Sequence, residues 1–207
     1  LRLVSSALRI PTGAFILNAG LGKFKVDKEG AEGLRDMAVD GVPQLGQVDA
    51  ETFATGLASA ETALGAALLW FGWFGFNGGS AGTADGTAGL AWVNTTVATA
   101  GAMLGWALVE RLRDKHVTSL GMASGVVAGL VAITPAAAAL TPLTSIVLGL
   151  AAGLACALAV GLKYRFGYDD SLDVFGVHCV GGILGALATG ILVNPALGGV
   201  GAPDYAT

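Results

Sequence analysis

The sequence predicts an all-α integral membrane protein, and three observations support this fold class. Of its 207 residues, 54% are apolar and only 13% are charged, a balance that the core of a soluble domain of this length does not need. More than half of the lysines and arginines lie in the first 58 residues, so the longer remainder carries little charge. That remainder divides into five apolar stretches, each close to the length of a helix that crosses roughly 30 Å of hydrocarbon.

The five stretches define the predicted domain organisation. Residues 1–58 form a polar or divergent N-terminal segment in which the pattern places no membrane span, and residues 59–194 form the transmembrane region. Residues 195–207 are rich in glycine and proline and are predicted to form an extracytoplasmic loop. The predicted helices run over about 62–79, 86–109, 119–140, 142–164 and 173–193.

The loops between these helices carry a charge signal for orientation. Arg111, Arg113 and Lys115 lie between the second and third predicted helices, and Lys163 and Arg165 lie between the fourth and fifth. The loops on the opposite side contain no lysine or arginine. By the positive-inside rule the basic side faces the cytoplasm. We therefore expect a multi-pass protein of the cell (plasma) membrane whose partner along most of its length is the lipid bilayer.

Glycine recurs at four-residue spacing within the predicted helices. Small residues at this spacing allow two helices to approach closely in lipid. We interpret them as packing residues of a tight bundle and not as a chemical site. They are Gly101 and Gly105, then Gly121, Gly125 and Gly129, then Gly149 and Gly153, and finally Gly181 and Gly185.

His178 lies within the fifth predicted helix, where an ionisable group is costly to bury in its charged form. The neutral imidazole both donates and accepts a hydrogen bond, which suits a pore-lining group that passes on a proton or a polar solute. On a regular helix Gly182 and Gly185 share its face and leave space beside the ring. The alternative is a structural histidine that bonds a neighbouring helix.

Acidic residues gather at the beginning of the same helix. Asp169, Asp170, Ser171 and Asp173 lie where carboxylates accept from free backbone N–H groups and face the positive end of the helix dipole. We predict that Asp170 and Asp173 cap the helix at its cytoplasmic end. A direct part for Asp173 in moving a cation is the alternative.

The first predicted helix ends in a run of aromatic and glycine residues, from Trp70 to Ser80. An aromatic belt at the membrane surface explains part of this run. It does not explain Asn77 and Ser80, which follow the aromatic residues where an outer vestibule would open. Aromatic faces together with a hydroxyl group attract a small cation.

Several function classes are disfavoured. The net charge is −4 and the basic residues form no large cluster with interleaved aromatics, so we expect no nucleic-acid partner. The sequence contains no nucleophile–base pair and no set of metal ligands at a typical spacing. We therefore expect a protein that is not an enzyme and that holds no metal or other cofactor.

Two stretches resemble the ammonium transporter family (Amt/Mep/Rh). The run Gly72–Ser80 is similar to the Gly-Trp-Phe-Gly-Phe-Asn-x-Gly-Ser run of the family's sixth helix, and the run Asp173–Cys179 is similar to the Asp-Val-Phe-Gly-Val-His-Gly run of its tenth helix. Only Cys179 differs in the second run. The resemblance covers nearly everything after Leu64 and implies five helices that form one half of an inverted-repeat transporter, which is usually a homotrimer.

The resemblance also implies roles for individual residues. Ser80 would belong to an outer recruitment site for ammonium, Phe76 to a gate below it, and Trp73 to the nearby pore lining. His178 would belong to a pair of pore histidines. The resemblance implies that a cation would be recruited outside and that ammonia would then cross a hydrophobic pore as a neutral molecule, because a bare ion cannot cheaply enter an apolar channel.

The family's first half supplies the second histidine and the partner phenylalanine, and no matching motif precedes Gly72. We therefore expect ammonium transport to require a complementary first half. The alternative is an ammonium-sensing or non-transporting structural membrane module. A cytoplasmic PII-type signalling protein is a further partner that the resemblance implies.

Overall fold

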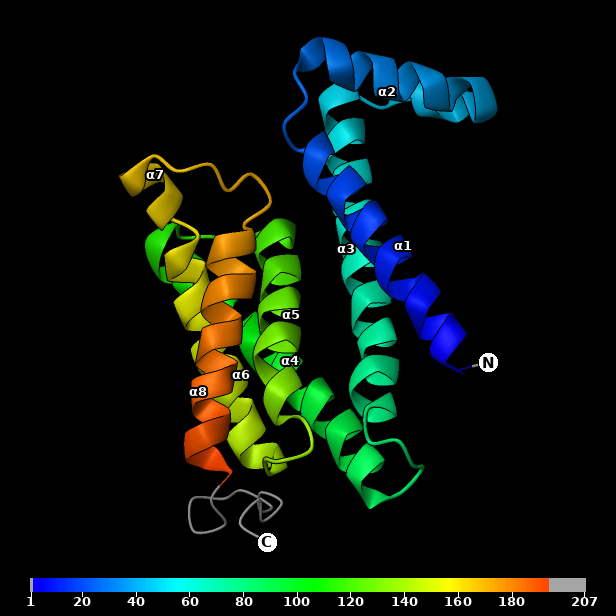
Figure 1. Cartoon of the computed structure of the whole chain (residues 1–207). Helices are drawn as coiled ribbons and strands as arrows, with labels where there is room; N and C mark the ends of the chain where they lie inside the picture. The colour runs from blue at the N-terminus through cyan, green and yellow to red at the C-terminus, as the bar shows by residue number, and fades with distance from the viewer. Residues whose placement is uncertain (1, 194–207) are drawn as a thin grey trace, which may run out of the picture.

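The computed structural model describes residues 2–193, and of residues 2–11 the backbone alone (Figure 1). The predicted loop at 195–207 lies outside the described residues. The described chain is helical and contains no strand, which confirms the all-α prediction. Its main helices are α1 (Arg2–Lys23), α2 (Lys28–Gly41), α3 (Ala50–Gly79), α4 (Gly86–Arg113), α5 (Ser119–Ile133), α6 (Pro142–Ala159), α7 (Leu162–Phe166) and α8 (Val180–Leu192). Three shorter segments are the 3-10 turns η1 (Pro43–Gln47) and η2 (Thr134–Ala136) and the π-helical segment η3 (Val174–Cys179).

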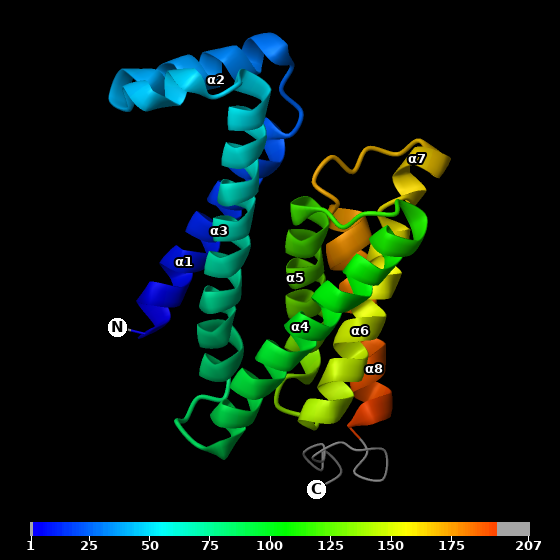
Figure 2. The same ribbon diagram turned by 180° about the vertical axis from the view of Figure 1, so that it is seen from behind.

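The helices form two groups in space. Helices α4, α5, α6 and α8 pack into a bundle, whereas α1 lies along α3, and α2 crosses the end of that pair (Figures 1 and 2). Helix α3 meets the bundle through α4 and α5. We call the end of the bundle at Ser80 the aromatic end and the end at Arg111 the basic end.

The N-terminal segment differs from the prediction. Helix α3 begins at Ala50 and not near residue 62, and the Asp49 carboxylate accepts from the Thr52 backbone N–H at 3.0 Å to cap it. The predicted boundary at residue 58 therefore lies inside α3. Helix α1 forms in a segment where no span was predicted, and Lys23 near its end pairs with Glu61 of α3 at 2.8 Å. The start of α3 was predicted too late because charged residues in its first turns interrupt the apolar pattern.

Two of the predicted helices end earlier than expected. Helix α5 ends at Ile133 and continues only as the turn η2, because Pro135 has no N–H to donate and cannot continue the α-helical hydrogen bonds. Helix α6 ends at Ala159. The short helix α7 ends at Phe166 and is followed by Gly167, whose left-handed φ of 72° suits a residue without a side chain.

Four helical stretches of the described chain are long and apolar enough to cross a membrane: Ala50–Gly79, Ser119–Ala136, Pro142–Phe166 and Val174–Leu192. The remaining predicted span, the second, corresponds to α4, which has 28 residues and the necessary length but carries more polar side chains. Asn94, Thr95 and Thr99 are 0% exposed, and each donates a hydrogen bond inside the bundle. Polar groups in a membrane helix are tolerated when they are satisfied internally in this way.

The closest helix contact in the bundle joins α4 and α6. A Cβ atom added at Gly149 would lie 2.8 Å from Ala98 Cα, and one added at Gly153 would lie 2.9 Å from Ala102 Cα. A Cβ added at Gly101 would lie 2.8 Å from the backbone oxygen of Ile146. These distances leave no space for a side chain, which confirms the predicted packing role of these glycines.

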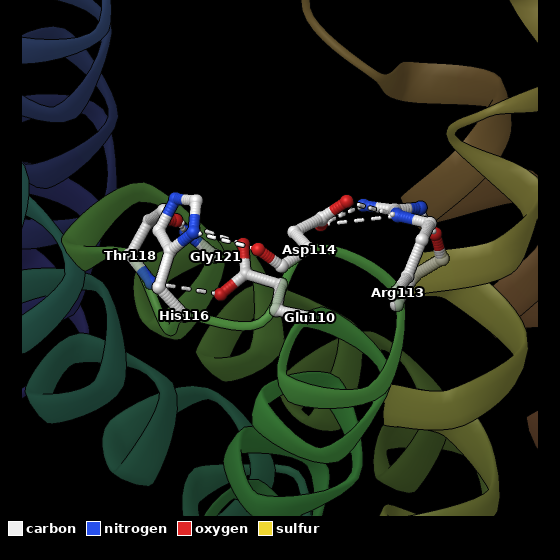
Figure 3. Close-up of polar contacts among 7 residues, drawn as sticks. Glu110, Arg113, Asp114, His116, Thr118 and Gly121 are labelled. Atoms are coloured by element: carbon white, nitrogen blue, oxygen red, sulfur yellow. Dashed lines mark hydrogen bonds and ion pairs between the residues drawn. The ribbon is translucent and has the colours of Figure 1, made fainter.

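A buried carboxylate closes the corner between α4 and α5 at the basic end (Figure 3). Glu110 is 7% exposed, and its two oxygens accept from the backbone N–H and the hydroxyl of Thr118, each at 2.8 Å. The Thr118 hydroxyl in turn accepts from the backbone N–H of Gly121 at 2.9 Å. A side chain at Gly121 would overlap with the carboxylate. The corner therefore fixes where α5 begins relative to the end of α4.

The α4–α6 contact generates the first prediction. We expect Gly149→Ala to lower the stability of the bundle by about 1–3 kcal/mol, because the added methyl group forces two backbones apart. Gly190→Ala is the matched control, since no atom lies within 4 Å of a Cβ at that position of α8. Alanine there should be neutral or stabilise by about 0.5–1 kcal/mol. Thermal unfolding in detergent measures both; equal midpoints for the two variants would contradict the contact.

Candidate functional site

The predicted site residues lie on two separate elements. Trp73, Phe76 and Ser80 belong to the last turns of α3, whereas His178 lies on η3 at the start of α8. Helix α5 lies between α3 and α8 in both views (Figures 1 and 2). The structure thus brings the three α3 residues together and leaves His178 on a different part of the bundle.

Trp73 is held by a hydrogen bond across the helices. Its indole N–H donates to the Thr134 hydroxyl at 2.8 Å, and that hydroxyl donates to the Leu130 carbonyl at 2.7 Å. Trp73 also contacts Phe76 edge-on, with ring centroids 5.7 Å apart. This geometry is favourable for two aromatic rings. Thr134 is 61 residues away in the sequence, so no local pattern could identify it as the partner.

Phe76 and Asn77, near the end of α3, differ in burial. The Phe76 side chain is exposed, whereas Asn77 is 4% exposed and donates to the Thr95 hydroxyl of α4 at 2.9 Å. The expectation that Asn77 belongs to an outer vestibule is therefore wrong. Its amide instead ties α3 to α4, because a buried amide must find a partner inside the bundle.

Ser80 caps the end of α3 and remains exposed. Its hydroxyl donates to the Phe76 carbonyl at 2.7 Å, so the oxygen retains lone pairs that can accept from another donor. Phe76 and Ser80 therefore present an aromatic face and a hydroxyl oxygen within one helical turn of each other. Such a combination is suited to a small cation with N–H donors.

Asp85 organises the loop that follows Ser80. Its carboxylate accepts from the Thr83 hydroxyl at 2.7 Å and from the backbone N–H groups of Thr87 and Ala88 at 2.9 and 3.2 Å. The hydrogen bond from Thr83, followed by that from Ala88, lowers the pKa of Asp85 below its ordinary value. The ionised form thus caps α4 and fixes the loop beside the exposed aromatic residues.

His178 is exposed on the surface of η3. The two residues before it, Gly176 and Val177, are buried, and a Cβ added at Gly176 would lie 2.9 Å from Val160 Cα. The prediction of a regular helix here is wrong, because η3 is a π-helix with a wider turn. Gly185 consequently packs against Ala132 and does not leave open space on the face of His178, as the regular spacing had predicted.

Asp170 and Asp173 differ in what they bind. The Asp170 carboxylate accepts from the backbone N–H of Phe175 at 3.0 Å and of Gly176 at 3.2 Å, so it holds the first turn of η3. Asp173 makes no capping hydrogen bond and has a left-handed φ of 55°. Its carboxylate instead pairs with Lys163 at 2.5 Å. The prediction of a capping role is therefore wrong for Asp173, because the basic side chain competes for its carboxylate.

The described residues contain no group of three or more histidine, cysteine, aspartate or glutamate side chains that could hold a metal ion. The arrangement therefore offers aromatic faces, hydroxyl oxygens and one exposed imidazole as its chemical groups.

Comparison with known proteins relates this arrangement to a family. The family model described as "Ammonium Transporter Family" matches residues 40–205. The chain belongs to the ammonium transporter family. The match begins within α2 and therefore includes part of the N-terminal segment that the sequence pattern left unassigned.

Individual members of the family are similar in sequence. An ammonium transporter of Mycobacterium tuberculosis is 61% identical over 132 residues, which cover 64% of this chain and 28% of that protein. An ammonium transporter of Bacillus subtilis is 52% identical over 142 residues, which cover 68% of this chain and 35% of that protein. The chain thus spans about a third of the length of these relatives.

Solved structures share the arrangement of helices. The crystal structure of Saccharomyces cerevisiae Mep2 matches with a TM-score of 0.63 and 40% identity over 70% of this chain and 35% of that one. A protein described as "Sensor Amt Protein" matches with a TM-score of 0.64 and 33% identity over 68% of this chain and 35% of that one. Together with its four apolar helices, these matches make the chain a multi-pass membrane protein.

The capping role of Asp170 generates a prediction. Asp170→Ala leaves the backbone N–H groups of Phe175 and Gly176 without their acceptor and should destabilise the first turn of η3 by about 1–2 kcal/mol. Hydrogen exchange at these two amides should become roughly tenfold faster, as a loss of 1.4 kcal/mol implies. Amides in α4 serve as the internal control, and unchanged exchange at Phe175 would contradict the cap.

The lowered pKa of Asp85 generates a pH prediction. A depressed pKa means that the ionised carboxylate is favoured in the folded protein, so its contribution is present above the ordinary pKa of an aspartate and is lost as pH falls through the lowered value. Asp85→Asn should therefore lower the thermal midpoint at neutral pH, and the difference from the unmodified chain should shrink in acid. A difference in thermal midpoint that grows in acid would contradict the lowered pKa of Asp85.

Proposed function

We propose that this chain contributes the pore residues of one half of an ammonium transporter. The observation that carries the proposal is the family match over residues 40–205 combined with the grouping of Trp73, Phe76 and Ser80 at one end of α3. The substrate is ammonium, which crosses the membrane as ammonia through a hydrophobic pore. His178 is the pore imidazole.

Recruitment of the cation begins at the aromatic end. The Phe76 face attracts NH4+ through its quadrupole, with an effect of about 0.5–1 kcal/mol at an exposed site. The Ser80 oxygen accepts one N–H of the ion, because its own hydrogen is already donated to the Phe76 carbonyl. Trp73 holds the Phe76 ring from below and itself lines the pore nearby.

Passage through the apolar region requires loss of the charge. Carrying an ion through hydrocarbon is costly, whereas neutral ammonia passes with far less loss of solvation. The imidazole of His178 accepts or donates a hydrogen bond to ammonia and can relay the separate proton. Asp170 positions the imidazole indirectly, because it holds the turn of η3 that carries His178.

A complete pore needs the complementary first half of the fold, which would cover the exposed face of His178. The assembly we expect is a homotrimer of complete transporters. A PII-type signalling protein would bind at the basic end, where the cytoplasmic loops lie.

Uptake of radiolabelled methylammonium tests the proposal. In membranes that contain the chain together with its complementary half, His178→Ala should reduce uptake on the order of tenfold or more, because the proton relay is lost. Phe76→Ala should weaken the recruitment of the cation and also reduce uptake. His116→Ala is the matched control, since that histidine lies in the loop of the basic end and its Nδ1–H donates to the backbone carbonyl of Asp114 in the same loop. Equal uptake in all three variants would refute the assigned roles.

A second candidate function is ammonium sensing without transport, which the similarity to the "Sensor Amt Protein" structure favours. A sensor would bind ammonium at the aromatic end and show no net uptake. Calorimetric binding of ammonium that is abolished by Ser80→Ala, together with zero methylammonium uptake, would favour this function over transport.

A further inference from the structure

Five buried side-chain polar atoms have no hydrogen-bond partner among the described residues, and two of them lie on the packed pair α4 and α6: Oδ1 of Asn94 and Oγ of Ser145. Both residues are 0% exposed. An unpaired polar atom in a buried position is costly, and most such atoms in native proteins are bonded to protein or to an ordered water.

The alignment of α4 with α6 places these two residues at the same level. Gly149 packs against Ala98, and Gly153 packs against Ala102 one turn further on. In both pairs the α6 residue follows the α4 residue by the same number of positions in the sequence. One turn back toward the aromatic end, the same alignment pairs Ser145 with Asn94. The register thus places the two unpaired atoms at the same level of the α4–α6 interface.

The chemistry of the two atoms is complementary. The amide nitrogen of Asn94 donates both hydrogens, to the Ala137 carbonyl at 2.8 Å and to the Leu140 carbonyl at 2.7 Å. Carbonyl oxygens only accept, so this orientation of the amide is fixed and Oδ1 remains as an acceptor. The Ser145 hydroxyl can donate one hydrogen and accept another.

We propose that Asn94 and Ser145 bind one buried water molecule between α4 and α6. The water donates a hydrogen to Asn94 Oδ1 and accepts the hydrogen of the Ser145 hydroxyl, which gives it two of the two to four partners that a buried water requires. A direct hydrogen bond does not join the two side chains. The site is closed to solvent, so the water is a part of the folded structure.

Through the Asn94 side chain, the water connects three segments: α4, the turn after η2, and α6. Asn94 already holds the turn after η2 through Ala137 and Leu140, and the water adds α6 through Ser145. The site is independent of the proposed transport, because it requires only that the bundle is folded.

A double-mutant cycle tests the proposal on the full chain in detergent. Ser145→Ala alone should lower the thermal midpoint by about 2–4 °C, whereas in an Asn94→Leu background it should cause no further decrease, because the shared water is already lost. Thr96→Val is the matched control on α4, since its hydroxyl is exposed and donates to Trp92 of its own helix. Its effect should be the same in both backgrounds. Additive effects of Asn94→Leu and Ser145→Ala would overturn the proposal.

A structure at a resolution that reveals ordered solvent supplies a second test, which stands even if Asn94→Leu does not fold. We expect one density peak at hydrogen-bond distance from both Asn94 Oδ1 and Ser145 Oγ, and we expect it to be missing in Ser145→Ala. An empty interface in the unmodified chain, or a direct bond between the two side chains, would overturn the proposal.

Discussion

The bundle depends on the backbone contact between α4 and α6. Gly149 and Gly153 leave no side chain between the two helices, so the carbonyl groups of Ala98 and Ala102 lie directly against α6. Lipid gives no hydrophobic drive for helix association, and close packing of small residues takes its place. Helices α5 and α8 pack onto this pair through glycines of their own: Gly129 lies against Thr99 of α4, and Gly185 lies against Ala132 of α5.

Polar side chains then set where the remaining segments lie. Asn77 joins α3 to α4, Asn94 joins α4 to the turn after η2, and Trp73 joins α3 to Thr134. All three bonds lie toward the aromatic end, where α3 reaches the bundle. Glu110 has the equivalent role at the basic end. The exposed Phe76 and Ser80 thus lie next to residues of α3 that are anchored to the bundle by these hydrogen bonds, of which the Asn77–Thr95 bond is buried.

The sequence predicted the features that repeat and missed those that depend on a single distant partner. Apolar length located the starts of the last four predicted helices within one residue, although two of them end earlier than predicted, and glycine spacing identified the α4–α6 contact. The start of α3 was missed because Glu51 and Glu61 interrupt the apolar pattern, although Glu61 has a partner in Lys23. The inward direction of Asn77 and the pairing of Asp173 with Lys163 depend on residues 18 and 10 positions away. In the candidate site, local motifs predicted which residues belong to the site, but they did not predict that Thr134 bonds to Trp73.

The π-helical segment affects the direction in which the His178 side chain leaves the helix. A π-turn holds one residue more than an α-turn, and such turns often lie at functional positions. Because each residue of an α-helix turns the chain by about 100°, the extra residue of the π-turn rotates the imidazole by roughly that angle relative to its direction on a continuous α-helix. The direction of the histidine therefore depends on the number of residues in the turn, in addition to Gly176, which packs closely against Val160. A change of one residue in the length of this segment would therefore alter the direction of the imidazole.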